Sequence, residues 1–122
     1  MPKLILLIED EPTLQKTLGR ALAQAGYGVQ SALDGQSGLA LIKRNKPNLV
    51  LLDLILPKMD GFEVLRSIKQ DPEIKDTPVI VLTNLESPQD VEKALSEGAT
   101  NYLVKANYEL SEVIKKVKEI IG

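Results

Sequence analysis

The sequence Leu49-Val50-Leu51-Leu52-Asp53 sets four consecutive apolar residues directly before a carboxylate. The runs at residues 4–8 and 79–82 are also apolar throughout, a further run lies at residues 102–104, and a weaker one lies at residues 29–33. A strand that is solvated on one face alternates apolar with polar residues, whereas a strand covered on both faces does not. We therefore expect five short strands, three of which are buried on both faces.

The segments between these runs have the periodicity of helices. Apolar residues recur at helical spacing within residues 14–25, 39–42, 62–68, 91–95 and 110–121. Five alternations of strand and helix predict a parallel sheet with helices on both faces. The expected fold class is α/β, a doubly wound (βα)5 flavodoxin-like fold whose five-stranded parallel sheet has the order 2-1-3-4-5. A chain of this length fits one such domain, over residues 1–122.

The composition excludes several classes of function. The net charge is −2 with no extended basic cluster, so direct binding of nucleic acid is not expected. The chain has no cysteine and no histidine, which leaves no thiol nucleophile, thiolate metal site, imidazole base or phosphohistidine. The apolar runs are too short to cross a bilayer, and residues 1–3 leave no room for the basic segment of a signal peptide. We expect a cytoplasmic protein that makes no membrane contact.

Side chains with reactive groups follow four of the five apolar runs, namely Glu9 and Asp10, Asp53, Thr83, and Lys105. In an open doubly wound sheet, ligands bind beyond the carboxyl ends of the strands, where the strand order reverses. Strands one and three flank that point in the order 2-1-3-4-5, so Glu9, Asp10 and Asp53 should converge. Carboxylates so close raise one another's pKa unless a cation neutralises them. The donor set suits Mg²⁺ better than Ca²⁺.

These groups are the components that phosphoryl transfer requires. Asp53 is the candidate nucleophile and Asp10 a candidate metal ligand. Thr83 supplies a hydroxyl, and Lys105 supplies a fixed positive charge. Such reactions depend on positioning and on neutralising the charge of the phosphoryl oxygens. The product here would be an aspartyl phosphate.

Each of these residues also has an ordinary structural interpretation. Asp10, which precedes Glu11 and Pro12, is equally typical of a helix start. Thr83 alone is typical of a strand and Lys105 alone of a solvated surface. Asp53 differs, because a charged residue between two apolar runs is costly unless it is exposed or paired. The functional interpretation therefore depends on the set of residues.

Four motifs together resemble the response-regulator receiver domains of two-component signalling, including the single-domain chemotaxis receivers. The motifs are Leu6-Leu7-Ile8-Glu9-Asp10-Glu11-Pro12, Leu51-Leu52-Asp53-Leu54-Ile55-Leu56-Pro57-Lys58-Met59-Asp60-Gly61, Val81-Leu82-Thr83, and Gly98-Ala99 followed by Tyr102-Leu103-Val104-Lys105. The resemblance spans the whole chain. It implies that Asp53 is the phosphoryl acceptor. It also implies that Mg²⁺ is bound by Asp10, by Glu9 directly or through water, by Asp53, and by the backbone carbonyl of Ile55.

The same resemblance implies a switch and a set of partners. Thr83 and Lys105 would contact the phosphoryl group, and Tyr102 would turn inward when Thr83 moves toward it, which changes a protein-binding face. The donor would be a sensor histidine kinase or a phosphotransfer protein, and the output a downstream effector protein. The domain would be a monomer or a phosphorylation-dependent dimer. It would catalyse only its own phosphorylation and dephosphorylation, and so would not be an enzyme in the usual sense.

Two enzyme or ligand-binding alternatives lack a required residue. A phosphatase with an aspartyl nucleophile needs a general acid two residues after Asp53, where this chain has Ile55. A nucleotide or flavin binder needs a glycine-rich turn after the first strand, where this chain has Glu9-Asp10-Glu11-Pro12.

Two positions depart from the family's usual pattern. Glu9 stands where the family usually has aspartate, and its extra methylene changes the reach of the carboxylate. Ala106 stands where the family usually has a cis proline after its lysine. A cis bond to alanine would cost roughly 3–4 kcal/mol, so the loop is either trans or strained. These departures keep open an alternative, a receiver that is never phosphorylated and acts as a constitutive interaction module.

Overall fold

The run Leu49–Leu52 forms β3, the central strand of a parallel sheet in a computed structural model that describes residues 2–122. Within those residues the sheet has five strands, β1 (Leu4–Ile8), β2 (Gly28–Ala32), β3, β4 (Val79–Thr83) and β5 (Asn101–Val104). Their order is β2-β1-β3-β4-β5, and all neighbouring pairs are parallel. The predicted flavodoxin-like fold and strand order are confirmed.

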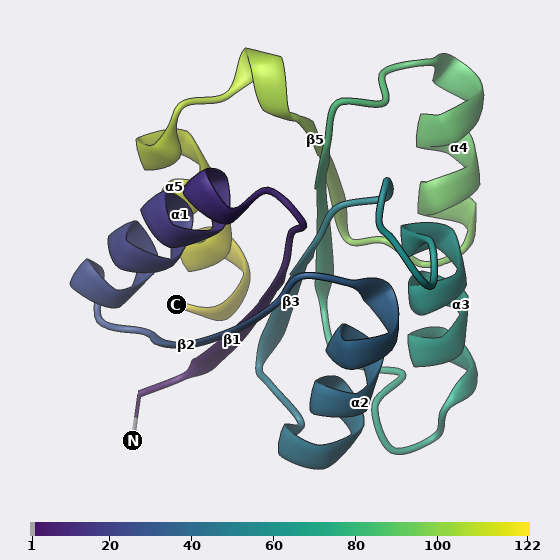
Figure 1. Cartoon of the computed structure of the whole chain (residues 1–122), viewed down its shortest axis with the longest axis horizontal. Helices are drawn as coiled ribbons and strands as arrows, with labels where there is room; N and C mark the ends of the chain where they lie inside the picture. Colours follow the sequence, from purple (N-terminus) through teal and green to yellow (C-terminus); the bar gives the residue numbers. More distant parts are fainter. Residues whose placement is uncertain (1) are drawn as a thin grey trace.

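Helices cover both faces of this sheet, as Figure 1 shows. On one face lie α1 (Pro12–Gln24) and α5 (Leu110–Ile121). On the other lie α2 (Gly35–Asn45), α3 (Gly61–Gln70) and α4 (Pro88–Ser96). A short 3₁₀ helix, η1 (Lys105–Asn107), connects β5 to α5.

Each central strand supplies apolar side chains to both helical layers. Val50 and Leu52 pack against the layer of α2, α3 and α4. Leu49 and Leu51 pack against the layer of α1 and α5. All residues of β3 are fully buried. This two-sided burial explains why the run shows no alternation of apolar and polar residues.

Three helix starts are fixed by side chains that accept hydrogen bonds from backbone N–H groups. Asp34 caps α2, Asp60 caps α3 and Ser87 caps α4. Such caps satisfy N–H groups that have no partner inside the helix. They also set where each connection from the carboxyl end of a strand stops, so they help to shape the sheet edge at which the candidate site lies.

Two residues at the ends of predicted apolar stretches are more exposed than the stretches implied. Leu33 lies just beyond β2 and is 48% exposed. Leu95 is 47% exposed, while its neighbour Ala94 is buried. Adjacent helical residues point about 100° apart, so α4 turns the side chain of Ala94 to the core and that of Leu95 outward. Among residues 2–122, no helix is long and apolar enough to span a bilayer.

Candidate functional site

The candidate site lies at the carboxyl ends of β1 and β3, which are neighbours in the sheet. Backbone hydrogen bonds extend the sheet beyond the strand ends. Glu9 N–H donates to the carbonyl of Ala32 at 3.1 Å, and Asp53 N–H donates to the carbonyl of Ile8 at 3.1 Å. Carboxylate oxygens of Glu9, Asp10 and Asp53 all lie within 4.8 Å of one another. The predicted convergence of these three acids therefore exists in the structure.

The Asp53 carboxylate is buried and both of its oxygens have partners. The side chain is only 5% exposed. Oδ1 accepts a hydrogen bond from the N–H of Ile55 at 3.2 Å, and Oδ2 accepts one from Lys105 Nζ at 2.8 Å. These two contacts fix the orientation of the carboxylate. They also provide the pairing that a buried charge requires.

The Glu9 carboxylate is similarly held at both oxygens. Oε2 accepts the N–H of Glu11 at 3.0 Å, and Oε1 lies 2.7 Å from Lys105 Nζ. Burial raises the pKa of Glu9, although the hydrogen bond from Lys105 and that from the N–H of Glu11 oppose the shift. Glu9 thus belongs to the acidic cluster, as the sequence predicted, and in addition binds the lysine of the set.

Lys105 bridges two of the three acids. Its Nζ contacts both Glu9 and Asp53, and its side chain is 15% exposed. Burial would lower the pKa of Lys105, but the hydrogen bonds to Asp53 and Glu9 outweigh it, so the pKa is raised and the ammonium form is favoured. Residues 2–122 contain no cis peptide. The bond between Lys105 and Ala106 is therefore trans, which resolves the alternative that the sequence left open.

Thr83 and Tyr102 lie on the neighbouring strands β4 and β5. Thr83 is fully buried and ends β4, where its Oγ1 accepts the N–H of Leu85 at 3.4 Å. Tyr102 is half-buried, and its hydroxyl donates to the carbonyl of Leu85 at 2.7 Å. Burial raises the pKa of Tyr102 to about 12, with contributions from the charges of Asp90 and Asp53. Both side chains thus engage the connection between β4 and α4.

The sequence did not single out Gln15, which supports the site from α1. Its side-chain amide donates to the carbonyl of Glu9 at 3.2 Å and to that of Ala32 at 3.0 Å. These bonds tie the ends of β1 and β2 to the first turn of α1. No sequence signal marks this residue, since glutamine on a helix is most often solvated.

The acidic cluster is suited to a hard divalent cation. Its donors are all carboxylates, because the chain has no cysteine or histidine, and oxygen donors favour ions such as Mg²⁺, Mn²⁺ and Ca²⁺. Asp10 is exposed, whereas Glu9 and Asp53 are buried. The position of Lys105 Nζ between two of the acids shows that the cluster attracts positive charge.

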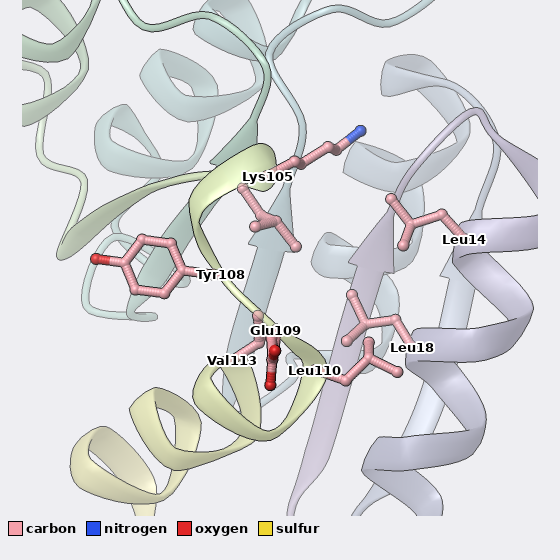
Figure 2. A pocket seen from close by; sticks show the side chains of 8 residues that line it. Leu14, Leu18, Lys105, Tyr108, Glu109, Leu110 and Val113 are labelled. Carbon is pink, nitrogen blue, oxygen red and sulfur yellow. The ribbon is translucent and has the colours of Figure 1, made fainter.

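A cavity of about 370 Å³ adjoins the site on the side of α1 and α5. Its lining is mostly apolar and consists of Leu14, Leu18, Leu82, Lys105, Tyr108, Glu109, Leu110 and Val113. Figure 2 shows the ammonium of Lys105 pointing away from Glu109, Leu110 and Val113, and the hydroxyl of Tyr108 pointing away from the other labelled side chains. The cavity is therefore separate from the acidic cluster and touches it only through Lys105.

Comparison with known proteins identifies the family. The model of the response regulator receiver domain matches residues 5–118, so the chain belongs to that family. The chain is 39% identical over 121 residues to the DNA-binding dual master transcriptional regulator RpaA of Synechocystis, a match that covers 99% of this chain and 49% of RpaA. It is 39% identical over 114 residues to the transcriptional regulatory protein HprR of Escherichia coli, with 93% and 49% covered. The chain spans about half the length of these relatives.

Solved structures agree with this assignment. The chemotaxis protein CheY4 of Vibrio cholerae superposes with a TM-score of 0.91 at 26% identity, covering 99% of this chain and 100% of CheY4. The Mn²⁺-bound form of the response regulator Rcp1 superposes with a TM-score of 0.83 at 35% identity, covering 98% and 91%. The fold is thus that of receiver domains, and one structural relative has been solved with a divalent metal bound.

Proposed function

We propose that this chain is the phospho-accepting receiver domain of a two-component response regulator. In this proposal, Asp53 accepts a phosphoryl group from the phosphohistidine of a sensor histidine kinase or a phosphotransfer protein. The environment of the Asp53 carboxylate supports the proposal most directly. That carboxylate is buried, lies 2.8 Å from Lys105 Nζ, and belongs to a cluster of three acids at the carboxyl edge of the sheet.

The transfer needs little covalent chemistry from the protein. A carboxylate oxygen of Asp53 forms a bond to phosphorus while the bond between phosphorus and the histidine nitrogen breaks, and the electron pair of that bond stays on the imidazole. The N–H of Ile55, 3.2 Å from Oδ1, orients the nucleophile. The ammonium of Lys105 neutralises charge on the phosphoryl oxygens. Burial of Asp53 strengthens these interactions by excluding water.

The proposed cofactor is Mg²⁺. Its protein ligands would be the carboxylates of Glu9, Asp10 and Asp53 and the backbone carbonyl of Ile55. When bound, the ion would supply charge neutralisation between the acceptor carboxylate and the incoming phosphoryl group. The three carboxylates could bind one such ion together, because their oxygens lie within 4.8 Å of one another.

The proposed output is a change of protein-binding face. Thr83 and Tyr102 both bond to Leu85, through its N–H and its carbonyl respectively. Movement of Thr83 toward a phosphoryl group would therefore disturb the connection that Tyr102 holds. The partner that reads this change is an effector protein, contacted by a monomer or by a phosphorylation-dependent dimer. We infer no direct contact of this chain with nucleic acid, because its net charge is −2.

The proposed setting is the cytoplasm, and the proposed chemistry is limited to the chain's own phosphorylation and dephosphorylation. Ile55, two residues after the acceptor, cannot act as the general acid that turnover on external phosphate esters requires. The domain would therefore act stoichiometrically as a switch and not as an enzyme.

Intact-mass analysis after incubation with acetyl phosphate tests the proposal. We expect the mass to rise by one phosphoryl group with Mg²⁺ present and not with a chelator. Asp53→Asn should abolish the adduct. Asp71→Asn is the matched control, because Asp71 follows α3 at the end of that helix opposite to the site. An adduct on Asp53→Asn, or none on the wild-type chain with Mg²⁺, would refute the proposal.

A further inference from the structure

We propose that Gln15 is a positioning residue for Asp10, and that its side-chain amide sets the orientation of a carboxylate that has no side-chain partner of its own. This inference deepens the proposed function, on which it rests for the binding of a divalent cation by the acidic cluster. It assigns a role in that binding to a residue of α1 that lies outside the cluster.

Asp10 differs from the other two acids in how its carboxylate is held. Glu9 and Asp53 are buried, and each has partners on both carboxylate oxygens. Asp10 is exposed, and among residues 2–122 its carboxylate makes no hydrogen bond or ion pair. The place of the Asp10 carboxylate in the cluster therefore depends on the backbone that carries it.

The backbone directly before Asp10 is held by a closed set of hydrogen bonds. Glu9 N–H donates to the carbonyl of Ala32 at 3.1 Å. Nε2 of Gln15 donates to that same carbonyl at 3.0 Å and to the carbonyl of Glu9 at 3.2 Å. The carbonyl of Glu9 lies in one rigid peptide plane with the N–H and Cα of Asp10. An amide that fixes this carbonyl therefore also restricts the direction in which the Asp10 side chain leaves the backbone.

The Gln15 side chain has a fixed base in α1 and the chemistry that the two carbonyls require. Gln15 is half-buried, and its own N–H donates to the carbonyl of Glu11 at 3.0 Å. The start of α1 has no side-chain cap, in contrast to the starts of α2, α3 and α4. A glutamine amide nitrogen carries two hydrogens, one for each carbonyl, and no charge. Gln15 thus links the start of α1 to the ends of β1 and β2.

Binding of Mn²⁺ to metal-free, unphosphorylated protein measures the effect of this link. Free Mn²⁺ gives an electron paramagnetic resonance signal that is lost on binding, so a titration yields a dissociation constant. Gln15→Met removes both hydrogen bonds and keeps a side chain of similar length. We expect it to raise the dissociation constant about tenfold, because residues that orient metal ligands contribute about 10–100-fold to metal affinity. Gln15→Leu should give a similar increase, which would exclude a contribution from the methionine sulfur.

A control variant and a second measurement separate positioning from a structural role. Gln24→Met makes the same substitution at an exposed residue that ends α1, and it should keep the wild-type dissociation constant. Urea denaturation with a chelator present gives the free energy of unfolding of each variant. A merely structural Gln15 would change that free energy and leave Mn²⁺ affinity unchanged. Wild-type affinity in Gln15→Met or Gln15→Leu would overturn the proposal, and so would a tenfold loss in Gln24→Met.

Failure of this inference can be distinguished from failure of the proposed function. Mn²⁺ binding by the wild-type chain without uptake of a phosphoryl group from acetyl phosphate would refute the proposed function and leave the role of Gln15 standing. Absence of Mn²⁺ binding by the wild-type chain would overturn the role of Gln15 together with the proposed cofactor.

Discussion

Two connections at the carboxyl edge of the sheet hold their functional residues in different ways. The connection from β3 to α3, which carries Asp53, is closed by backbone contacts. Gly61 N–H donates to the carbonyl of Leu54 at 2.9 Å, and Gly35 N–H donates to that of Pro57 at 3.3 Å. The connection from β5 to α5, which carries Lys105, exposes Ala106 and Asn107 to solvent. It also lines the cavity between α1 and α5. The backbone that carries the acceptor is thus held by main-chain hydrogen bonds, whereas the Lys105 side chain is held by its charged contacts with Glu9 and Asp53.

This difference suits the two proposed tasks. A nucleophile reacts efficiently only when it is held near its attack geometry. A neutralising ammonium, in contrast, must follow charge that moves from two carboxylates to a phosphoryl group. A side chain held by ion pairs can shift when the charges shift, whereas one held by packed backbone cannot. The following changes test whether the two connections differ as described.

The largest expected effect on stability is at Gly61, because a methyl group there would clash with the backbone of the connection from β3 to α3. A Cβ there would lie 2.3 Å from the carbonyl oxygen of Asp53 and 2.4 Å from the Cα of Leu54. We expect Gly61→Ala to lower the free energy of unfolding by about 4 kcal/mol, measured by urea denaturation. Gly19→Ala is the matched control, because its nearest contact is an ordinary 3.7 Å to Val29. It should raise the free energy of unfolding by about 0.5–1 kcal/mol. Equal effects at both glycines would contradict a rigid connection.

An intermediate effect is expected at Tyr102, which gives the connection from β4 to α4 one side-chain hydrogen bond. Tyr102→Phe removes the bond to the carbonyl of Leu85 and should lower the free energy of unfolding by about 1 kcal/mol. Tyr108→Phe is the control, since Figure 2 shows its hydroxyl pointing away from the neighbouring side chains. A loss as large in Tyr108→Phe as in Tyr102→Phe would show that the Leu85 contact contributes nothing.

The smallest expected effect is a gain in stability beside the connection from β5 to α5, where the cavity lies. Val113 lines the cavity, so Val113→Leu has space for an added methylene and should raise the free energy of unfolding by about 0.5–1 kcal/mol. Val117 lies one turn further along α5 and is fully buried, so Val117→Leu should lower the same quantity by about 1–3 kcal/mol. Thermal denaturation of both variants gives the comparison. A loss in Val113→Leu equal to that in Val117→Leu would mean that the cavity is not usable space.

The convergence of Glu9, Asp10 and Asp53 was predictable from the sequence, because a strand buried on both faces is recognisable as an uninterrupted apolar run. Four apolar residues followed by Asp53 mark a strand end, and strand order alone then brings Glu9 and Asp10 to it. The contact of Lys105 with Glu9 was not predictable in this way. Lys105 follows β5, and two strands separate β5 from β1. Whether its side chain crosses that distance depends on the loop conformation, which Ala106 left undecided between a cis and a trans bond.

The ion pair between Lys105 and Asp53 joins residues that lie 52 positions apart in the sequence. Contacts between such distant residues form late, because the chain must close a long loop before they contribute any stability. During synthesis, a chain that has emerged only as far as β4 has Glu9, Asp10 and Asp53 but no ammonium among them. Three neighbouring carboxylates without that charge repel one another. The complete charge arrangement of the candidate site therefore exists only once β5 has joined the sheet, so a chain that has emerged only as far as β4 lacks the lysine of the site.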